Sequence, residues 1–178
     1  MAIQDVIAEL NRVKAEGLIS DFALGGAVAA MVYIEVADTE DVDVFVAVSP
    51  PEGTSLDPLS AVWPNLTAHG AKQDGMYLVI GGWKVQLLAS GKPLYDEAIA
   101  TALQKEMGGQ ACRIIAPTYL AALALDAGRA KDYSRIEQFL STDKKGSRVS
   151  REELEVLVER FALVERWNTF RRRYLGEE

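Results

Sequence analysis

The chain has 178 residues, of which 49% are hydrophobic and 25% are charged, and its net charge is −7. This length and composition predict a globular protein with a sizeable core. The negative charge argues against general nucleic-acid binding, which depends on neutralising phosphates, and no apolar run approaches the ~20 residues of a membrane span. Because the N-terminus also lacks a signal-peptide pattern, we expect a cytoplasmic protein with no membrane partner.

The N-terminal region predicts a helix, a strand, a second helix and a second strand. Apolar residues at helical spacing, ended by Gly17, predict the first helix: Ile3, Val6, Ile7, Leu10 and Val13. A strand over 22–24 then leads into Gly25 and Gly26, and a run of small residues over 27–33 predicts a helix. The strand over 42–48 has apolar residues on both faces, so we expect it to be central in a sheet.

The middle of the chain predicts a loop, a short helix and a hairpin. Residues 49–53 are rich in proline and form the loop, and 59–66 form a short helix that Pro64 interrupts. Apolar runs over 76–80 and 83–88 flank Gly81 and Gly82, and such a glycine pair strongly favours a β-hairpin. Alternation along 83–88 places Gln86 on the same face as Lys84.

The remaining elements are mostly helical. We expect a helix over 94–107, ended by Gly108 and Gly109, and a brief strand over 112–115 that includes Cys112 as a small core residue. Pro117 opens a helix that Thr118 caps. Ser150 and Glu153 form a capping box for a last helix with the apolar stripe Leu154, Leu157, Phe161, Val164 and Trp167. The lone His69 is expected in a surface loop, and the arginines 171–173 at a solvated helix end rather than on RNA.

Two carboxylates stand at the entrance of the second strand. Asp41 and Asp43 are two positions apart, so their side chains point to the same face. Neighbouring carboxylates repel each other unless a cation or a proton lies between them. Their oxygens suit a hard divalent metal such as Mg²⁺, or Mn²⁺ in its place, which takes further ligands from substrate phosphates.

The glycine pair at 25–26 supplies the second half of such a site. Glycines allow a ligand to approach the main chain, and a following helix offers unpaired N–H groups to a phosphate. With Thr39, Asp41 and Asp43 in the register Thr-x-Asp-x-Asp, this stretch resembles the polymerase-beta type nucleotidyltransferase superfamily, and within it the small bacterial AbiEii-toxin-like branch. Against this stands a simpler interpretation, in which the stretch is a tight turn followed by a solvated acidic loop.

The resemblance implies a function and a set of site residues. It implies binding of an NTP with Mg²⁺ and transfer of its NMP to a hydroxyl of RNA, protein or a small molecule. Asp41 and Asp43 would hold the metal, and Gly25, Gly26 and Thr39 would line the nucleotide site. It extends to Arg129, Lys131 and Asp132, which match an Arg-x-Lys-Asp stretch of related proteins. An equal alternative is that these three residues only decorate a connection between helices.

Two departures from the family pattern bear on catalysis. A third carboxylate is expected where Gln86 stands, and glutamine can bind a metal through its carbonyl but cannot act as a base. A lysine is expected where Ala124 stands. Both departures favour a second hypothesis, in which the protein is a degenerate module that binds a nucleotide or a cognate partner protein, as in a toxin–antitoxin pair.

The resemblance also predicts the architecture. We expect an α/β (α+β) fold, with a nucleotidyltransferase-like mixed β-sheet flanked by helices and a helical C-terminal extension. Residues 1–115 would form the α/β core, and residues 116–178 a helical portion packed on it.

Overall fold

The structure is a computed structural model that describes residues 2–36, 39–48 and 57–177. The chain divides into two compact units. The sheet unit comprises residues 1–28 and 39–115, and the helical unit comprises residues 29–38 and 116–178. The loop expected over 49–53 lies outside the described residues.

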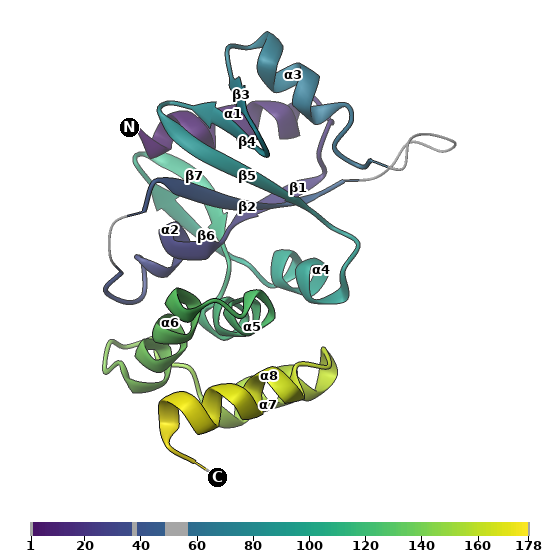
Figure 1. The fold of residues 1–178 in the computed structure, drawn as a ribbon. Helices are drawn as coiled ribbons and strands as arrows, with labels where there is room; N and C mark the ends of the chain where they lie inside the picture. Colours follow the sequence, from purple (N-terminus) through teal and green to yellow (C-terminus); the bar gives the residue numbers. More distant parts are fainter. Residues whose placement is uncertain (1, 37–38, 49–56, 178) are drawn as a thin grey trace. The chain divides into compact units, whose positions relative to one another are not determined.

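In the described part of the sheet unit, seven strands form one mixed sheet in the order β3-β4-β5-β2-β1-β7-β6 (Figure 1). Their bounds are β1 Asp21–Leu24, β2 Asp41–Ala47, β3 Lys72–Asp74, β4 Tyr77–Ile80, β5 Trp83–Ala89, β6 Leu103–Met107 and β7 Gln110–Ile114. Strand β2 is central, as predicted, and lies antiparallel to β1 and parallel to β5. The fold is thus the mixed α/β arrangement that the sequence predicts.

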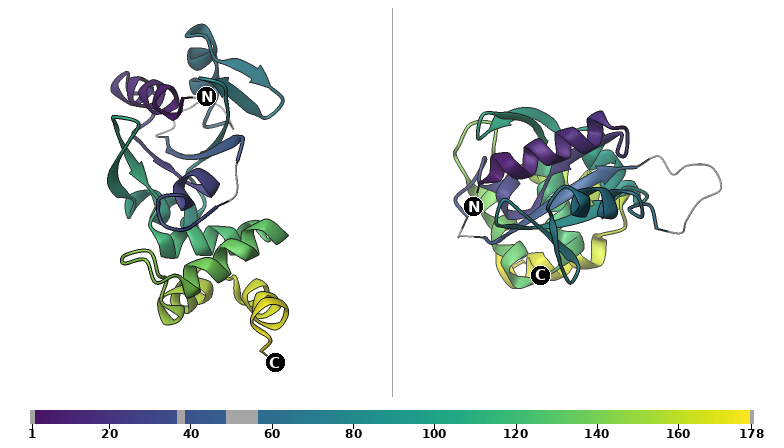
Figure 2. Two further views of the ribbon diagram at one scale, coloured as in Figure 1. Left: turned by 90° about the vertical axis from the view of Figure 1, so that its left-hand side faces the viewer. Right: turned by 90° about the horizontal axis from the view of Figure 1, so that it is seen from above.

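Three helices lie wholly within the described part of the sheet unit: α1 (Ile3–Ala15), α3 (Val62–Ala68) and α4 (Pro93–Ala100). A fourth, α2 (Gly26–Ala30), begins in the sheet unit and ends in residues of the helical unit. Helix α1 runs along the sheet (Figure 2) and packs against β1, β5 and β7, burying the apolar stripe that predicted it. Helix α4 packs against β1 and β2, where the ring of Tyr95 meets the ring of Phe45 edge-on at 4.9 Å. Pro64 lies in the first turn of α3, where no N–H partner is needed, so it does not interrupt that helix.

Both glycine pairs in the second half of this unit form hairpins. Gly81 and Gly82 join β4 to β5, as predicted. The helix predicted over 94–107 is wrong beyond Ala100, because β6 pairs antiparallel with β7 around Gly108 and Gly109. These two glycines have φ of 59° and 77°, the left-handed values of a tight hairpin turn. Pairing with β7 therefore overrides the helical preference of residues 103–107. Strand β3 was not predicted.

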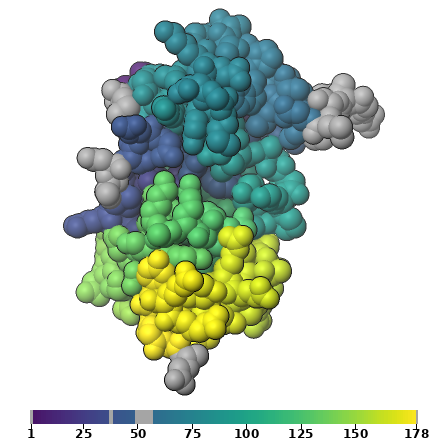
Figure 3. All heavy atoms as spheres, in the orientation of Figure 1, coloured from purple at the N-terminus to yellow at the C-terminus, as the bar shows by residue number. Residues whose placement is uncertain are grey.

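The helical unit contains four longer helices: α5 (Pro117–Ala127), α6 (Ala130–Ser141), α7 (Arg151–Arg160) and α8 (Val164–Phe170). A π-helical turn, Arg171–Leu175, follows α8. Rings of Tyr133, Trp167, Phe170 and Tyr174 pack on one another in its core. The side chains of α7, α8 and the π-helical turn form one close-packed surface (Figure 3).

Three sequence predictions for helix ends meet different outcomes. Ser150 caps α7 as predicted, since its Oγ accepts the N–H of Glu153 at 3.3 Å. Thr118 does not cap α5, whose N-cap is Ala116 and whose first residue is Pro117. The last helix is two helices, because Ala162 takes a left-handed φ of 55° between them. The break buries Leu163 and leaves Val164 44% exposed, so the predicted stripe is interrupted there, and it resumes at Trp167, which is 3% exposed.

Candidate functional site

The glycine turn contacts the acidic strand directly. The N–H of Gly25 donates to the carbonyl oxygen of Asp43 at 2.8 Å. A Cβ on Gly25 would lie 2.4 Å from the ring of Phe45, and a Cβ on Gly26 would lie 2.1 Å from Oδ2 of Asp43. Gly26 also has a φ of 57°, which other residues rarely adopt. Only glycine fits this approach, so the turn places its main chain beside the Asp43 carboxylate.

Asp41 and Asp43 lie on one face of β2, as their spacing predicts. Both are half-buried, whereas Val42 and Val44 on the opposite face are fully buried. Thr39 supports the first carboxylate, since its Oγ1 donates to Oδ1 of Asp41. The N–H of Asp41 in turn lies 3.4 Å from Thr39 Oγ1. This pair of contacts fixes the orientation of Asp41 at the start of the strand.

Strand β5 brings two further side chains to the same face. In the parallel register, Gln86 pairs with Asp43 and Lys84 pairs with Asp41. The predicted third position is therefore next to the acidic pair, and it carries an amide. The sequence did not predict Lys84 as part of this site, although the strand alternation already placed it on the same face as Gln86. Its Nζ lies 3.2 Å from Oδ2 of Asp74, and this hydrogen bond raises the pKa of Lys84, which stays cationic.

The side-chain oxygens at this site suit a cation that takes most of its ligands from water and from the substrate. Among residues 2–36, 39–48 and 57–177, no group of three or more His, Cys, Asp or Glu side chains is placed to hold a metal ion. What the strands provide is two carboxylates and the neutral carbonyl of Gln86. Mg²⁺ is commonly held by one or two carboxylates together with substrate phosphates, so these residues fit Mg²⁺.

Lys131 and Asp132 belong to the helical unit, whereas the acidic pair and the glycine turn belong to the sheet unit. Asp132 is 1% exposed and accepts hydrogen bonds from Nε of Arg129 at 2.6 Å and from Nη1 of Arg135 at 3.0 Å. These two ion pairs compensate the negative charge of the buried Asp132 carboxylate. Lys131 is exposed on the same helix, and Ala124 is buried in α5.

Neither the cysteine nor the histidine forms a site. Cys112 is buried in β7, as predicted, and burial raises the pKa of its thiol, which makes it a poor nucleophile. His69 is exposed at the end of α3, where its Nδ1 lies 2.9 Å from the carbonyl oxygen of Asn65. In the described part of the chain, no helix has both the length and the apolar character to cross a membrane.

Comparison with known proteins defines the class of fold. Neither the protein-family models nor the curated proteins include a match to this sequence. Solved structures do match, and two of them illustrate the likeness. An antigenic nucleotidyltransferase-like protein from Paracoccidioides brasiliensis is 14% identical with a TM-score of 0.51, covering 93% of this chain and 92% of that chain. The antibiotic-resistance factor ANT(2'')-Ia is 16% identical with a TM-score of 0.53, covering 98% of both chains.

The chain therefore has a nucleotidyltransferase-like fold, as the resemblance predicted. At these identities the likeness concerns the fold alone. The AbiEii-toxin-like branch stays a prediction.

Proposed function

We propose that this protein binds a nucleoside triphosphate with Mg²⁺ at Gly25, Gly26, Asp41 and Asp43, and transfers its nucleoside monophosphate to a hydroxyl group. The observation that carries the proposal is the contact between the glycine turn and Asp43, through a hydrogen bond of 2.8 Å and the close approach of Gly26. Because glycine has no side chain, main-chain N–H groups of the turn other than that of Gly25, which is bonded to Asp43, can donate to phosphate oxygens. Carboxylates beside the turn can hold the cation that those phosphates carry.

The residues of this site would have distinct roles. Asp41 and Asp43 bind the metal, and the Thr39 hydroxyl holds Asp41 in orientation. Mg²⁺ supplies positive charge to the phosphates during transfer. Gln86 adds a neutral carbonyl ligand beside Asp43. A role of Lys131 and Asp132 in nucleotide binding stays a prediction from the sequence. The acceptor hydroxyl would belong to RNA, a protein or a small molecule.

A second candidate function is nucleotide binding without transfer, and Gln86 favours it. The register places Gln86 beside Asp43 at the position where a third carboxylate is expected. An amide cannot take a proton from an acceptor hydroxyl, and it adds no charge for a second metal. Such a protein would act by binding a nucleotide or a partner protein, as one half of a toxin–antitoxin pair does.

Transfer is tested by labelling acceptors with α-³²P-labelled NTPs in the presence and absence of Mg²⁺. We expect label that depends on Mg²⁺ and is lost in the double variant Asp41→Asn, Asp43→Asn, which keeps the shape of both side chains. Glu106→Gln, an exposed acid on the edge strand β6, is the matched control and should keep its activity. Label that survives the double variant would refute the proposed site.

Calorimetry separates the two candidates. Binding of Mg-NTP without turnover identifies a nucleotide-binding module, whereas no binding excludes the enzyme and leaves only a role in binding a partner protein. Gln86→Asp is the restoration test, since it adds the missing carboxylate beside Asp43. If Gln86→Asp transfers the label and the natural chain does not, the natural chain is a degenerate member of its class.

A further inference from the structure

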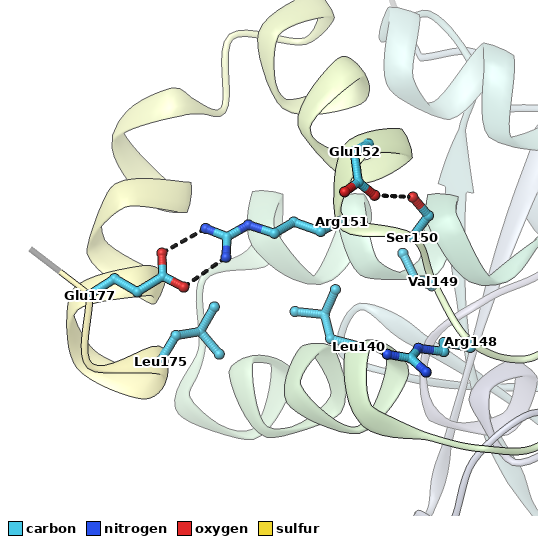
Figure 4. A pocket seen from close by; sticks show the side chains of 8 residues that line it. All are labelled: Leu140, Arg148, Val149, Ser150, Arg151, Glu152, Leu175 and Glu177. Carbon is cyan, nitrogen blue, oxygen red and sulfur yellow. Dashed lines mark hydrogen bonds and ion pairs between the residues drawn. The ribbon is translucent and has the colours of Figure 1, made fainter.

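The helical unit contains a pocket of about 650 Å³, remote in sequence from the acidic strand. The lining comes from the end of α6, the loop before α7, the start of α7, and the π-helical turn with the residues after it, among them Leu140, Arg148, Val149, Arg151, Glu152, Leu175 and Glu177. Its volume lies in the range of small-molecule sites. In Figure 4, Leu140 and Leu175 lie between Glu177 at one end and Arg148 at the other.

At one end of the pocket, a carboxylate of the chain itself sits on two guanidinium groups. Arg151 donates from Nη1 and Nη2 to the two oxygens of Glu177, at 2.7 Å and 2.6 Å. Arg171 donates from Nε to Oε2 at 2.8 Å. Two parallel hydrogen bonds from one guanidinium are the geometry by which arginine recognises carboxylates. These contacts lower the pKa of Glu177 to about 2.

The other end of the pocket has a cation that no described residue neutralises. Arg148 is exposed and has no hydrogen bond or ion pair to residues 2–36, 39–48 or 57–177. Figure 4 shows its side chain extending towards Leu140. The pocket therefore combines the exposed guanidinium of Arg148 with an apolar wall formed by Leu140, Val149 and Leu175. The Glu152 carboxylate in its lining accepts a hydrogen bond from Ser150 Oγ at 2.6 Å.

We propose that this pocket binds a small carboxylic acid with a short apolar chain, and that Glu177 occupies the carboxylate position on Arg151 and Arg171 when the ligand is absent. The ligand's carboxylate displaces that of Glu177 on Arg151 and Arg171, and its apolar chain lies on Leu140 and Leu175. The positive charge of Arg148, at the other end of the pocket, adds a longer-range attraction for the anion. The inference does not depend on the proposed nucleotide site, whose residues it does not share.

Displacement of Glu177 is compatible with its surroundings. The side chains of Arg151 and Glu177 are 37% and 31% exposed, so water solvates both charges when they separate. Ion pairs at such positions contribute little net stability. Glu177 also follows Gly176, which has a left-handed φ of 67°. A ligand with an apolar chain adds contacts that Glu177 does not make.

The test uses hexanoate, acetate and inorganic phosphate as probes, titrated by calorimetry into the full-length protein. We expect hexanoate to bind and the other two to bind at least about tenfold more weakly, because they lack the apolar chain. Glu177→Gln removes the internal competitor and should tighten hexanoate binding about tenfold. Arg148→Gln should weaken it several-fold, and the matched control Arg172→Gln, outside the pocket lining, should leave it unchanged.

A second readout needs no variant. In the natural chain at neutral pH, where hexanoate is ionised, saturating hexanoate should shift the NMR signal of the Glu177 carboxyl carbon, since displacement removes its guanidinium partners. The inference fails if hexanoate leaves that signal unchanged, if phosphate binds as tightly as hexanoate, or if Glu177→Gln binds hexanoate no better than the natural chain.

Discussion

The main-chain N–H of Gly25 donates a 2.8 Å hydrogen bond to the carbonyl oxygen of Asp43. These residues stand at opposite ends of a connection that includes the helix α2 (Gly26–Ala30), yet β1 and β2 pair antiparallel and bring them together. The proposed phosphate-binding turn and the proposed metal ligands are therefore parts of one local structure.

Gly26→Ala should impair both folding and nucleotide binding. A left-handed φ alone costs an alanine about 1 kcal/mol, and overpacking against Asp43 Oδ2 should add about 1–3 kcal/mol of lost stability. If Asp43 rotates to relieve the clash, the metal ligand moves instead. Urea denaturation and calorimetry with Mg-NTP measure the two effects.

The matched control for this change is Gly75→Ala. Gly75 has a similar φ of 62°, and no atom lies within 4 Å of the Cβ that alanine would add. Gly75→Ala should lose only the stability that a left-handed φ costs an alanine, and it should keep the full affinity for the nucleotide. Equal behaviour of the two variants in both measurements would contradict a functional approach of Gly26 to Asp43.

Thr39→Val should weaken metal binding while leaving the fold intact. Valine keeps the shape of threonine but cannot donate to Oδ1 of Asp41. Groups that orient a metal ligand typically contribute about tenfold or more in metal affinity. Thr39→Ser retains the hydroxyl and should restore the affinity. An Mg²⁺ titration in which Thr39→Val equals the natural chain would show that Thr39 does not position Asp41.

How far the sequence alone predicts this molecule depends on how local each signal is. The spacing of Asp41 and Asp43 and the hairpin at Gly81 and Gly82 are local, and both predictions match the structure. The helix over 94–107 failed because the same glycine-pair signal at 108–109 was interpreted as a helix end, when the partner strand β7 decided the outcome. A pairing between neighbouring strands is settled by tertiary contacts that local preferences do not contain.

The helix after the glycine turn shows a related limit. Small residues predict a helix over 27–33, but α2 ends at Ala30, and 31–34 form turns. So short a helix adds little dipole to a phosphate site, and the main chain of the turn itself must carry the proposed interaction. The apolar stripe after Ser150 likewise did not reveal the left-handed Ala162, because nothing in its spacing changes there.

Tyr33→Phe should stabilise the helical unit. Tyr33 is buried, and its hydroxyl has no hydrogen-bond partner among the described residues; burial also raises its pKa. Removing a buried unsatisfied hydroxyl recovers its lost hydration, about 1 kcal/mol. Tyr95→Phe, whose hydroxyl lies in an exposed contact with Lys92, is the control and should change little. A destabilised Tyr33→Phe in urea denaturation would indicate that the hydroxyl has a partner after all.

Acid should remove the stabilising effect of Glu177. Its pKa of about 2 in the folded chain lies below its ordinary value of 4.5, because Arg151 and Arg171 hold the charged form. The contribution is thus fully present above about pH 4.5 and is lost as the pH falls towards 2. The difference in unfolding free energy between the natural chain and Glu177→Gln should shrink over that interval. A difference that stays constant with pH would rule out this ion pair as its cause.

The central claim is that the glycine turn and the acidic pair grip one magnesium-bound triphosphate, and a crystal structure with Mg²⁺ and a non-hydrolysable NTP tests it most directly. We expect a metal ion on Asp41 and Asp43 and phosphates against Gly25 and Gly26. Phosphates bound elsewhere, or a protein that takes up no nucleotide under saturating conditions, would contradict the account.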